Sequence, residues 1–593
     1  MATMVETNVA PVTRTVRWLL TGSWSVVLVM AVLKAATVAR GFTTDAWALD
    51  LLDPDNYVRL AQIRDWLSGQ SWFDVTQYRI DPPSGMHTHW SRLADLPAGL
   101  PIWLLTPLTG AALAERLALV LTPLLLLVAA FALIVKAADG LAGPSARFPA
   151  AVVTLYAAKM QWEFVPGRID HHALQIVLIL ALVTALVTGE RARHGWLAAL
   201  AAALSLGVGM EAAPYVAIAA VWVALRWAWR GDAAQRVTTS FMAGIAVLVP
   251  LVFVLTVPIA DWWLPKGDAI GRGHVAAALL LGGALALAAA RTGRPRAVRF
   301  GMVIGFAAIG GSVVLAAFPE VVGEPYAMVG PLLLRLWIAN ISETRSAVQD
   351  WALSPSLAVA RLAFGVVMVG VGALLVWRAA GTQRDRLALA TGLALIGMVL
   401  GGWQYRSLAL GAAVALPLAG AAIAVLLARS LAAAMLGVAA AAVLLLADAL
   451  VPVPHALAAG PRDADCLGHA NWPDIARLPP GLVLGQINLA GPFLVWTPHS
   501  VLSSGMHRGH AGIRFSFETW MAKPDAALQQ AAVRGVRYVA VCTTSGETTV
   551  LSKTAPRGLV AALKRGEVPA GLIPVAHGGN AALKVFRLAP AVP

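Results

Sequence analysis

Acidic residues, histidines and arginines gather in a few short segments of a chain in which only 13% of the residues are charged. The longest of these segments carries Asp53, Asp55 and Arg59 near its start and Trp90 and Arg92 near its end. Carboxylates close to a lipid bilayer are costly in free energy unless they are paired or bind a metal ion. The segment therefore indicates either a cation site or a turn with solvated charges.

A second segment reads Asp170-His171-His172 at the start of an apolar run. Carboxylate oxygens and imidazole nitrogens together suit Mg²⁺ or Mn²⁺, and Zn²⁺ is a further candidate. The alternative interpretation is an aspartate that caps a helix, followed by two histidines at a membrane interface.

Two further segments, Ile341-Ser342-Glu343 and Trp403-Gln-Tyr405-Arg406, lie beside long apolar runs. The planar guanidinium group of arginine is well suited to hold a phosphate. Arg406 is therefore either a phosphate ligand or a side chain that extends to the membrane surface. Glu343 indicates little when it is considered alone.

The C-terminal part of the chain contains His499, His507 and Arg508 within a short stretch. These residues either line a substrate pocket or are solvated loop residues, and the sequence leaves both interpretations open.

The elements that must position these residues are mainly long apolar runs. Hydrophobic residues make up 59% of the chain and the mean hydropathy is +0.72, which excludes a disordered or collagen-like chain and an enzyme of several ordinary soluble domains. A run of about 20 apolar residues crosses a bilayer as a helix. We predict a mainly α-helical membrane protein of about thirteen such helices, which begin near Val16, Leu117, Phe148, Ala173, Trp196, Ala213, Thr238, Val275, Phe300, Leu357, Leu387, Ser407 and Leu431.

Lysines and arginines concentrate in alternate loops, as they do in the short cytoplasmic loops of membrane proteins. If the N-terminus with Arg14 and Arg17 is cytoplasmic, every basic loop lies on that side, provided that the proline-rich stretch Leu96–Leu108 does not span. The net charge of +14 then reflects topology and not nucleic-acid binding. The same count predicts four outer segments, which are residues 41–98, 161–171, 319–356 and the chain after about Val451.

The chain changes character after its last long apolar run. Strand-like stretches around Gly481 and Arg537 flank the helical stretch Pro524–Arg534, which predicts a small α/β domain over residues 453–593 behind a membrane domain over residues 1–452. Both cysteines, Cys466 and Cys542, belong to this outer domain. They form either a disulfide or two buried free thiols.

Taken together, these residues resemble the catalytic subunits of oligosaccharyltransferases, which are membrane glycosyltransferases of the GT-C class. The resemblance rests on several short motifs that cover most of the chain, together with the thirteen-helix architecture and its outer C-terminal domain. The matching residues are Asp53-Pro54 with Arg59, Pro83-Ser-Gly85, Trp90-Ser-Arg-Leu93-Ala-Asp95, Asp170-His171-His172, Ile341-Ser342-Glu343 and Arg406.

The resemblance implies a multi-pass enzyme of the inner (plasma) membrane whose C-terminal domain is periplasmic or extracellular. It would transfer a sugar or oligosaccharide from a polyprenyl-phosphate-linked donor to a protein, lipid or glycan acceptor, with inversion in a single displacement. Asp53, Asp170 and His172 would hold Mg²⁺ or Mn²⁺, Arg406 would bind the donor phosphate, and Asp53 and Glu343 would be catalytic. The resemblance leaves a set of possible donor or acceptor contacts, namely Arg59, Trp90, Arg92, His171, His499, His507 and Arg508.

One departure from the family concerns the acceptor. Members that recognise the Asn-x-Ser/Thr sequon carry Trp-Trp-Asp-Tyr-Gly in the outer domain, and the strand at the corresponding place here continues into Gln486-Ile487-Asn488. Transfer to asparagine in proteins is therefore in doubt.

Two alternatives stay open at this stage. One is a transferase that moves a single sugar from a polyprenyl monophosphate to a lipid, a glycan or a Ser/Thr hydroxyl. The other is a polytopic transporter of lipids or solutes, although transporters usually carry charged residues near the bilayer midplane and contain repeated halves. Glu211, beside Ala212-Ala213-Pro214, is the one residue that fits the transporter pattern.

Overall fold

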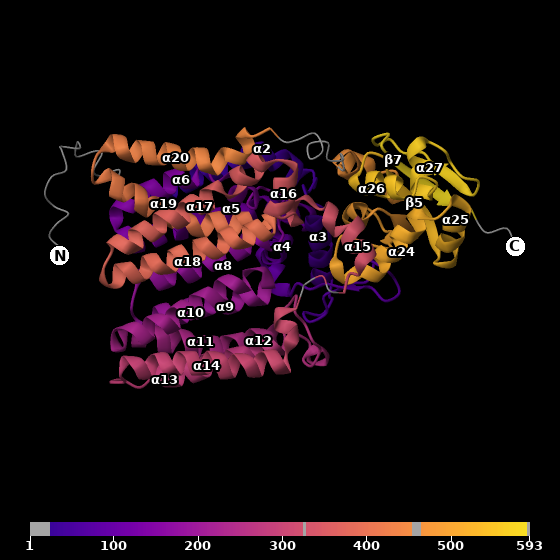
Figure 1. Ribbon diagram of the computed structural model, residues 1–593. Helices are drawn as coiled ribbons and strands as arrows, with labels where there is room; N and C mark the ends of the chain where they lie inside the picture. Colours follow the sequence, from indigo (N-terminus) through magenta and orange to yellow (C-terminus); the bar gives the residue numbers. More distant parts are fainter. Residues whose placement is uncertain (1–23, 324–325, 327, 453–463, 590–593) are drawn as a thin grey trace.

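The computed structural model of the chain describes residues 24–323, 326, 328–452 and 464–589. A large body of roughly parallel helices lies beside a smaller α/β domain that is formed by the C-terminal part of the chain (Figure 1). Val16, Arg14 and Arg17, on which the start of the first predicted helix and its orientation depend, lie outside the described residues.

Nine helical segments in the described part of the chain are long and apolar enough to cross a membrane. The protein is thus a multi-pass membrane protein with a mainly α-helical fold. These segments are α5 (Ala111–Ala142), Met210–Arg230 with α10 (Ala213–Arg230), α11 (Asp232–Thr256), Arg272–Ala289 with α12 (Arg272–Ala277) and α13 (Gly283–Ala289), α14 (Arg296–Ala317), α17 (Pro355–Arg378), α18 (Gly381–Trp403), Tyr405–Leu427 with α19 (Leu408–Leu427), and α20 (Leu431–Leu450).

Three further predicted runs form helices that are not among these nine spans, and these helices are α2 (Trp24–Trp47), α8 (His172–Thr188) and α9 (Ala192–Val208). The helix α2 continues through Trp47, whereas the sequence analysis begins the first outer segment at residue 41. The proline-rich stretch Leu96–Leu108 forms the fourteen-residue helix α4 (Leu96–Thr109), which is too short to be counted with the nine spans.

The run that begins near Phe148 does not form one long helix. It is divided into α6 (Arg147–Thr154) and α7 (Ala158–Trp162). The side-chain amide of Gln161 donates to the backbone carbonyl of Thr154, so a side chain occupies an acceptor that a continuing helix would use. This break brings the polar residues after Trp162 to the end of the bundle where the candidate site lies.

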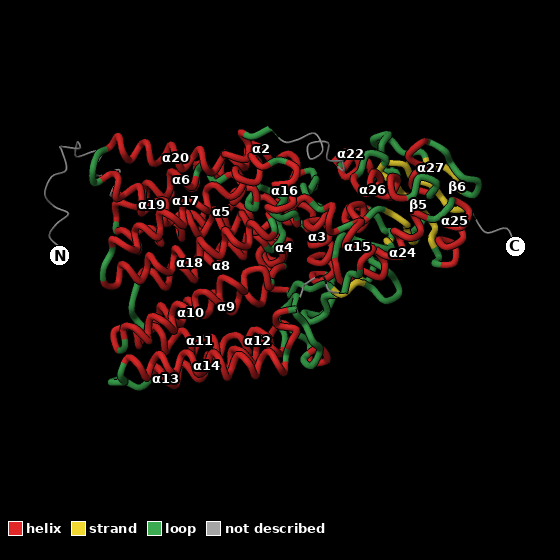
Figure 2. Tube along the Cα trace, in the orientation of Figure 1, coloured by secondary structure: helices red, strands yellow, loops and turns green. Residues whose placement is uncertain are grey.

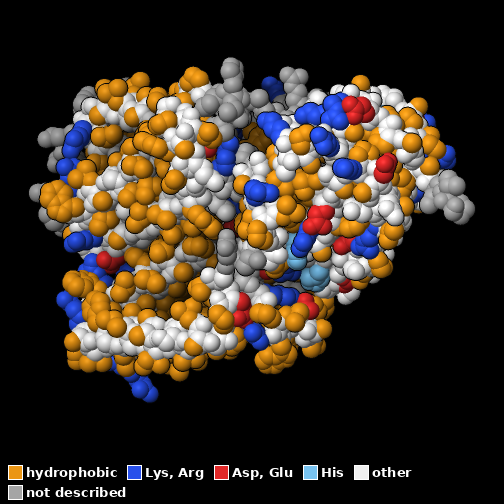
Figure 3. Space-filling model, turned by 45° about the vertical axis from the view of Figure 1, so that its right-hand side comes forward, with side chains coloured by type: hydrophobic (Ala, Val, Ile, Leu, Met, Phe, Trp, Pro, Cys, Tyr) orange, Lys and Arg blue, Asp and Glu red, His pale blue; other side chains and the backbone are white. Residues whose placement is uncertain are grey.

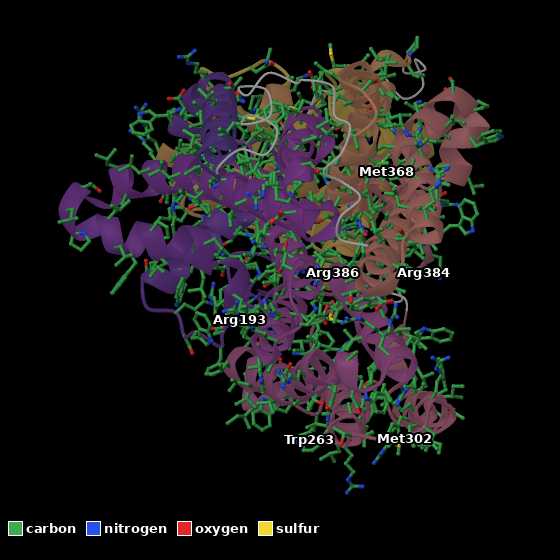
Figure 4. All side chains as sticks on the ribbon, turned by 90° about the vertical axis from the view of Figure 1, so that its left-hand side faces the viewer. Arg193, Trp263, Met302, Met368, Arg384 and Arg386 are labelled. Atoms are coloured by element: carbon green, nitrogen blue, oxygen red, sulfur yellow. A yellow bond between two sulfur atoms is a disulfide. The ribbon has the colours of Figure 1, made fainter. Side chains whose placement is uncertain are left out.

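The two ends of the helical body differ in charge. At the end far from the C-terminal domain, tight turns join the helices (Figure 2), and Arg193, Arg384 and Arg386 lie at this end when it faces the viewer (Figure 4). Hydrophobic side chains cover the sides of the helices between the ends (Figure 3). The basic loops predicted from the sequence therefore share one end of the bundle.

The C-terminal domain contains a five-stranded sheet with the strand order β4-β3-β5-β7-β6. The strands β4, β3 and β5 are parallel, whereas β7 pairs antiparallel with both β5 and β6. The strands are β3 (Leu482–Gly485), β4 (Ser500–Val501), β5 (Val536–Cys542), β6 (Leu572–Val575) and β7 (Leu583–Leu588). The helices are α22 (Ala464–Leu467), α23 (Ala490–Trp496), α24 (His510–Met521), α25 (Pro524–Val533), α26 (Gly546–Thr554) and α27 (Leu559–Arg565).

The first long loop joins the helical body to this domain. It contains α3 (Pro54–Leu67) and the hairpin of β1 (Thr76–Gln77) and β2 (Met86–His87). Ile80 pairs with Val501 at the edge of the sheet, so the loop extends the sheet by one short bridge. Buried side chains of α3, of the loop and of α23 belong to one continuous hydrophobic core, which makes the loop and the domain a single packed unit.

Gly491 in α23 allows a close approach between the two parts. A Cβ atom at this position would lie 2.6 Å from the Cβ of Tyr57 and 2.8 Å from the carbonyl oxygen of Pro54. Only glycine fits between these atoms without displacement of the α3 backbone. The third long loop, with α15 (Pro331–Leu336) and α16 (Ala347–Leu353), lies between the bundle and the domain (Figure 1).

The two cysteines form a disulfide that ties the start of the domain to the end of its central strand. The sequence separation of Cys466 and Cys542 is 76 residues. We predict that replacing both cysteines by serine lowers the free energy of unfolding of the domain by about 2–4 kcal/mol, because the unfolded chain regains the freedom that the cross-link removes. Thermal unfolding of the purified full-length protein, monitored by tryptophan fluorescence, measures the change. An unchanged transition in the double variant would contradict a structural role of the disulfide.

Candidate functional site

The start of α3 positions the first acidic residues. Asp53 is the N-cap of this helix and its side chain accepts a hydrogen bond from the backbone amide of Asp55 at 2.9 Å. The next residue, Asn56, is fully buried, and its side-chain oxygen accepts hydrogen bonds from the amides of Ile169 at 2.9 Å and Asp170 at 3.0 Å. One turn of α3 therefore holds both the first acidic motif and the backbone of the second.

Arg168 joins the carboxylates of the two motifs. Its guanidinium group lies 2.6 Å from Glu163, 3.1 Å from Asp170 and 3.8 Å from Asp53. The side chain of Arg168 is only 7% exposed, so these ion pairs act in a region of weak solvent screening. Although burial opposes its charge, the neighbouring carboxylates raise the pKa of Arg168, which therefore stays protonated.

Asp170, His171 and His172 form the one group of potential metal ligands found in the described part of the chain. Each offers a ligand atom, and these atoms all lie within 4.8 Å of one another. Asp170 also accepts a hydrogen bond from the backbone amide of His172 at 2.9 Å, which fixes the carboxylate at the start of α8. Although burial alone would raise the pKa of Asp170, His172 and Arg168 hold it well below its ordinary value.

Glu211, just before α10, orients the middle member of this group. Its carboxylate contacts Nε2 of His171 at 2.8 Å and 2.9 Å through its two oxygens. Within the described residues, Nδ1 of His171 is buried and has no hydrogen-bond partner. A carboxylate that binds one ring nitrogen while the other stays available is the usual support of a metal-binding histidine.

The carboxylates in this region outnumber the cations that balance them. Burial raises the pKa of Asp53, and the charge of Glu343 adds to this rise. Burial also raises the pKa of Asp55 well above its ordinary value, and Asp53, Glu343 and Asp170 raise it further. A divalent cation would relieve this repulsion, so the residues present fit a hard metal ion with oxygen and imidazole ligands.

Arg406 approaches the same cluster from the turn before α19. The charges of Glu343 and Glu211 both act on its guanidinium group. Its Nε donates to the side chain of Gln404 at 3.0 Å, and its Nη2 donates to the hydroxyl of Tyr326. A guanidinium group beside a potential metal site can hold an anionic group that also faces the metal.

A row of rings in contact, each tilted against the next, leads from the cluster to the C-terminal domain. The ring centroids are 4.3 Å apart between His172 and His171, 5.2 Å between His171 and Trp90, and 4.5 Å between Trp90 and His89. The ring of His89 then lies 4.6 Å from that of His507 in the C-terminal domain. The row connects α8, the first loop and the domain through direct contacts.

The far end of this row is fixed by Asp268, which lies in the loop between α11 and α12. Its carboxylate contacts Nε2 of His507 at 2.7 Å and pairs with Arg508 through bonds of 2.7 Å and 2.8 Å. Arg508 also donates to the backbone carbonyl of Thr88 at 3.0 Å. Histidine side chains are visible at this junction in the space-filling view (Figure 3). His507 and Arg508 therefore join three parts of the chain.

Apart from His507 and Arg508, which bind Asp268, the predicted site residues divide into two groups. Asp53, Asp170, His171, His172, Glu343 and Arg406 meet in one cluster, and Trp90 contacts it. Arg59 and Arg92 are instead buried in ion pairs with Asp95, at 2.8 Å and 3.0 Å, and Arg59 also lies over the ring of Trp90. His499 is fully buried in the C-terminal domain, where its Nε2 contacts the carbonyl of Ile475.

Sequence analysis assigned no role in the site to five residues that belong to it or support it. Asp55, Glu163 and Arg168 stand within or beside the quoted motifs, so their position in the sequence was a usable signal. Glu211 was noted only as an exception to the charge pattern. Asp268 lies in a loop of ordinary composition, and no local pattern indicates its contact with His507 and Arg508.

The fold is similar to that of solved oligosaccharyltransferases. An archaeal oligosaccharyltransferase, AglB from Archaeoglobus fulgidus, in complex with an inhibitory peptide and a dolichol-phosphate, matches 96% of this chain and 75% of its own with a TM-score of 0.62 and 13% identity. The Archaeoglobus fulgidus enzyme tethered to an acceptor peptide with an NVT sequon matches 97% and 75%, with a TM-score of 0.61 and 13% identity. Its complex with Zn and sulfate matches 95% and 73%, with a TM-score of 0.57 and 14% identity.

No protein-family model matches the chain, and no curated protein matches it. The likeness to the solved structures shows that the chain has the oligosaccharyltransferase-like GT-C fold, which confirms the architecture that the sequence motifs predict.

The cluster around Asp170 predicts that the protein binds a divalent metal ion. We expect the purified protein to bind Mn²⁺, and we expect Asp170→Asn to weaken binding at least about tenfold, because a ligand charge is lost. Asn56→Ala should weaken it by a smaller factor, of about 10 at most, because the amides of Ile169 and Asp170 lose their common acceptor. Isothermal titration calorimetry measures both effects. Asp525→Asn, at an exposed position of α25, is the control, and equal affinity in all four proteins would rule out the site.

The burial of His89 in the row of rings predicts how the stability of the fold depends on pH. Burial lowers the pKa of His89 well below its ordinary value, and His507 and Arg508 lower it further, although Asp268 and Glu211 oppose this. The unfolded chain therefore binds a proton below about pH 6.5 that the folded protein does not bind, so stability falls as pH falls. We expect a loss of about 1 kcal/mol between pH 7.5 and 5.5 that is absent in His89→Gln. Thermal unfolding across this range provides the test, and parallel curves for both proteins would refute it.

Proposed function

We propose that the protein is a membrane glycosyltransferase that moves a sugar or oligosaccharide from a polyprenyl-phosphate-linked donor to an acceptor. The observation that carries this proposal is the convergence of the Asp170-His171-His172 group with Asp53, Glu343 and Arg406 at one end of an oligosaccharyltransferase-like bundle. A donor with a lipid tail and an anionic headgroup suits a site at the edge of membrane-spanning helices. The dolichol-phosphate in the AglB structure supports this choice of donor class.

The donor phosphate is assigned to Arg406. Its guanidinium group donates a hydrogen bond to the hydroxyl of Tyr326, in a position where a phosphate oxygen could accept instead. Two parallel N–H groups and a full charge make arginine a strong phosphate ligand. Binding of the phosphate at Arg406 leaves the anomeric carbon beside Asp53 and Glu343.

The acidic residues are assigned two tasks. Asp53, Asp170 and His172 would hold Mg²⁺ or Mn²⁺, and such an ion would supply charge neutralisation for the departing phosphate. Asp53 and Glu343 orient the acceptor so that its nucleophilic atom faces the anomeric carbon, since placement alone contributes a large part of the rate. Attack forms the new bond to that carbon while the bond to the phosphate oxygen breaks, the phosphate keeps the electron pair, and the proton of the attacking group passes to the carboxylate of Asp53 or Glu343. A single displacement of this kind inverts the configuration of the sugar.

The acceptor is a protein, a lipid or a glycan, and one structural observation disfavours sequon asparagine. Gln486 stands where sequon-reading relatives have their tryptophan pair, and its side chain is 2% exposed. Its amide donates to the carbonyl of Cys542 and to Thr548, while its oxygen accepts the amide of Cys542 at 2.8 Å. All its polar atoms are used inside the domain, so none is free to read an acceptor hydroxyl.

The orientation follows from the distribution of charge. The arginine-rich turns share the bundle end far from the C-terminal domain, and such turns are retained on the cytoplasmic side. We therefore place the candidate site and the C-terminal domain on the periplasmic or extracellular side of the inner (plasma) membrane.

The test is a transfer assay with purified protein, lipid-linked sugars extracted from membranes, and Mn²⁺. We expect donor consumption by the wild type and a fall of about 100-fold or more in Asp53→Asn and Glu343→Gln, because groups positioned at the reacting atoms contribute factors of this size. Arg406→Lys should mainly raise the KM for the donor, by about tenfold, because the paired hydrogen bonds to phosphate are lost.

Two controls define the outcome. Asp525→Asn should retain wild-type activity, since this residue is exposed and lies in α25 of the C-terminal domain. A peptide with an Asn-x-Thr sequon should stay unmodified while donor is consumed with extracted lipid or glycan acceptors. Full activity of both acidic variants would refute the assignment of the site.

A further inference from the structure

A groove between membrane-spanning helices lies outside the site described above. It is lined by α7, α17, α18, α19 and α20, at the end of the bundle that carries the C-terminal domain. Its wall is mainly apolar, and its charged members are Lys159, Arg361 and Asp448. None of these three residues has a role in the proposed transfer reaction, so the inference is independent of that proposal.

Glycines create the depth of the groove. Gly397 in α18 and Gly411 in α19 approach so closely that a Cβ on Gly397 would lie 2.7 Å from the Cα of Gly411. This contact forms the closed floor. Gly365 in α17 is different, because a Cβ there would meet only Met398, at an ordinary distance of 3.4 Å. Gly365 therefore leaves space in the wall that a larger side chain would fill.

The mouth of the groove carries an excess of positive charge. Lys159 pairs with Asp448 at 2.7 Å. Arg361 and Arg345 both pair with Asp350, which is fully buried. The three basic side chains at the mouth are thus balanced by only the two carboxylates of Asp448 and Asp350. In the described part of the chain, Nε of Arg361 is buried and has no hydrogen-bond partner.

The surroundings of the groove determine what can occupy it. Four of the five elements that line it, α17, α18, α19 and α20, belong to segments that are long and apolar enough to span a membrane, so the medium beside these helices is lipid and not water. An acyl chain matches the apolar wall. A headgroup with one negative charge matches the unbalanced positive charge at the mouth, since opposite charges attract strongly where screening by water is weak.

We propose that this groove is a binding site for one anionic phospholipid. One acyl chain lies against Gly365 between α17 and α20, and the phosphate lies between Lys159 and Arg361. The lipid completes the charge balance at the mouth and fills the space that the glycines leave. Bound in this way, it stabilises the contact of α17 with Tyr405, whose ring lies 4.4 Å from the guanidinium carbon of Arg361.

Native mass spectrometry of the detergent-solubilised full-length protein tests the proposal. The protein is exchanged into equal amounts of phosphatidylglycerol and phosphatidylcholine that carry identical acyl chains. We expect one retained phosphatidylglycerol per chain, with a preference over phosphatidylcholine of at least about fivefold, which corresponds to one effective basic group. The comparison of the two lipids is made with the wild-type protein. Equal retention of both lipids would overturn the proposal.

Two pairs of variants localise the lipid. Gly365→Leu should abolish the retained phosphatidylglycerol, whereas Gly370→Leu in the same helix should keep it, because Gly370 is exposed and has no neighbouring side chain within 4 Å. Lys159→Gln should reduce the preference for phosphatidylglycerol about fivefold, whereas Arg378→Gln, at the opposite end of α17, should leave it unchanged. Retention in Gly365→Leu equal to that in the wild type would place the lipid elsewhere and overturn the proposal.

Discussion

The ion pairs of Arg168 are the interaction on which the rest of the candidate site depends. One guanidinium group contacts Glu163, Asp170 and Asp53, which come from two loops that are far apart in the sequence. Without this charge, three partly buried carboxylates would repel one another at the edge of an apolar bundle, where each costs free energy to bury. Burial, together with the repulsion that remains, raises the pKa values of Asp53 and Asp55.

The C-terminal domain is part of this arrangement and not an appendage. It shares a hydrophobic core with the first loop, extends its sheet through Ile80, and contacts the ring row through His507. Arg79 strengthens the junction, because its guanidinium group donates to the carbonyls of Leu494, Thr497 and His499 at the end of α23. Motion of the domain therefore changes the environment of Trp90, and through it that of the histidines of the cluster.

The sequence predicts much of the fold, because membrane helices leave a long and simple signal. Every predicted apolar run except the one near Phe148 corresponds to a helix. That run breaks where the carbonyl of Thr154 accepts from the amide of Ala157 and from the side chain of Gln161, contacts that hydropathy cannot reveal. The motifs bring the right residues to one cluster because each stands at a helix end. The roles of Glu211 and Asp268 depend on partners that are distant in sequence, and single residues in unremarkable loops carry no local pattern.

The close packing at Gly491 has a consequence for how such proteins can be recombined. Because any side chain there would collide with the α3 backbone, the C-terminal domain of a homologue could replace this one only if it presents glycine at the same point of its helix. Chimeric proteins built to exchange the C-terminal domain would thus have to be joined with a matched pair of α3 and α23, inherited together from one parent. The interchangeable unit is then the domain plus the first loop, which has to be transferred as two separate stretches of the gene.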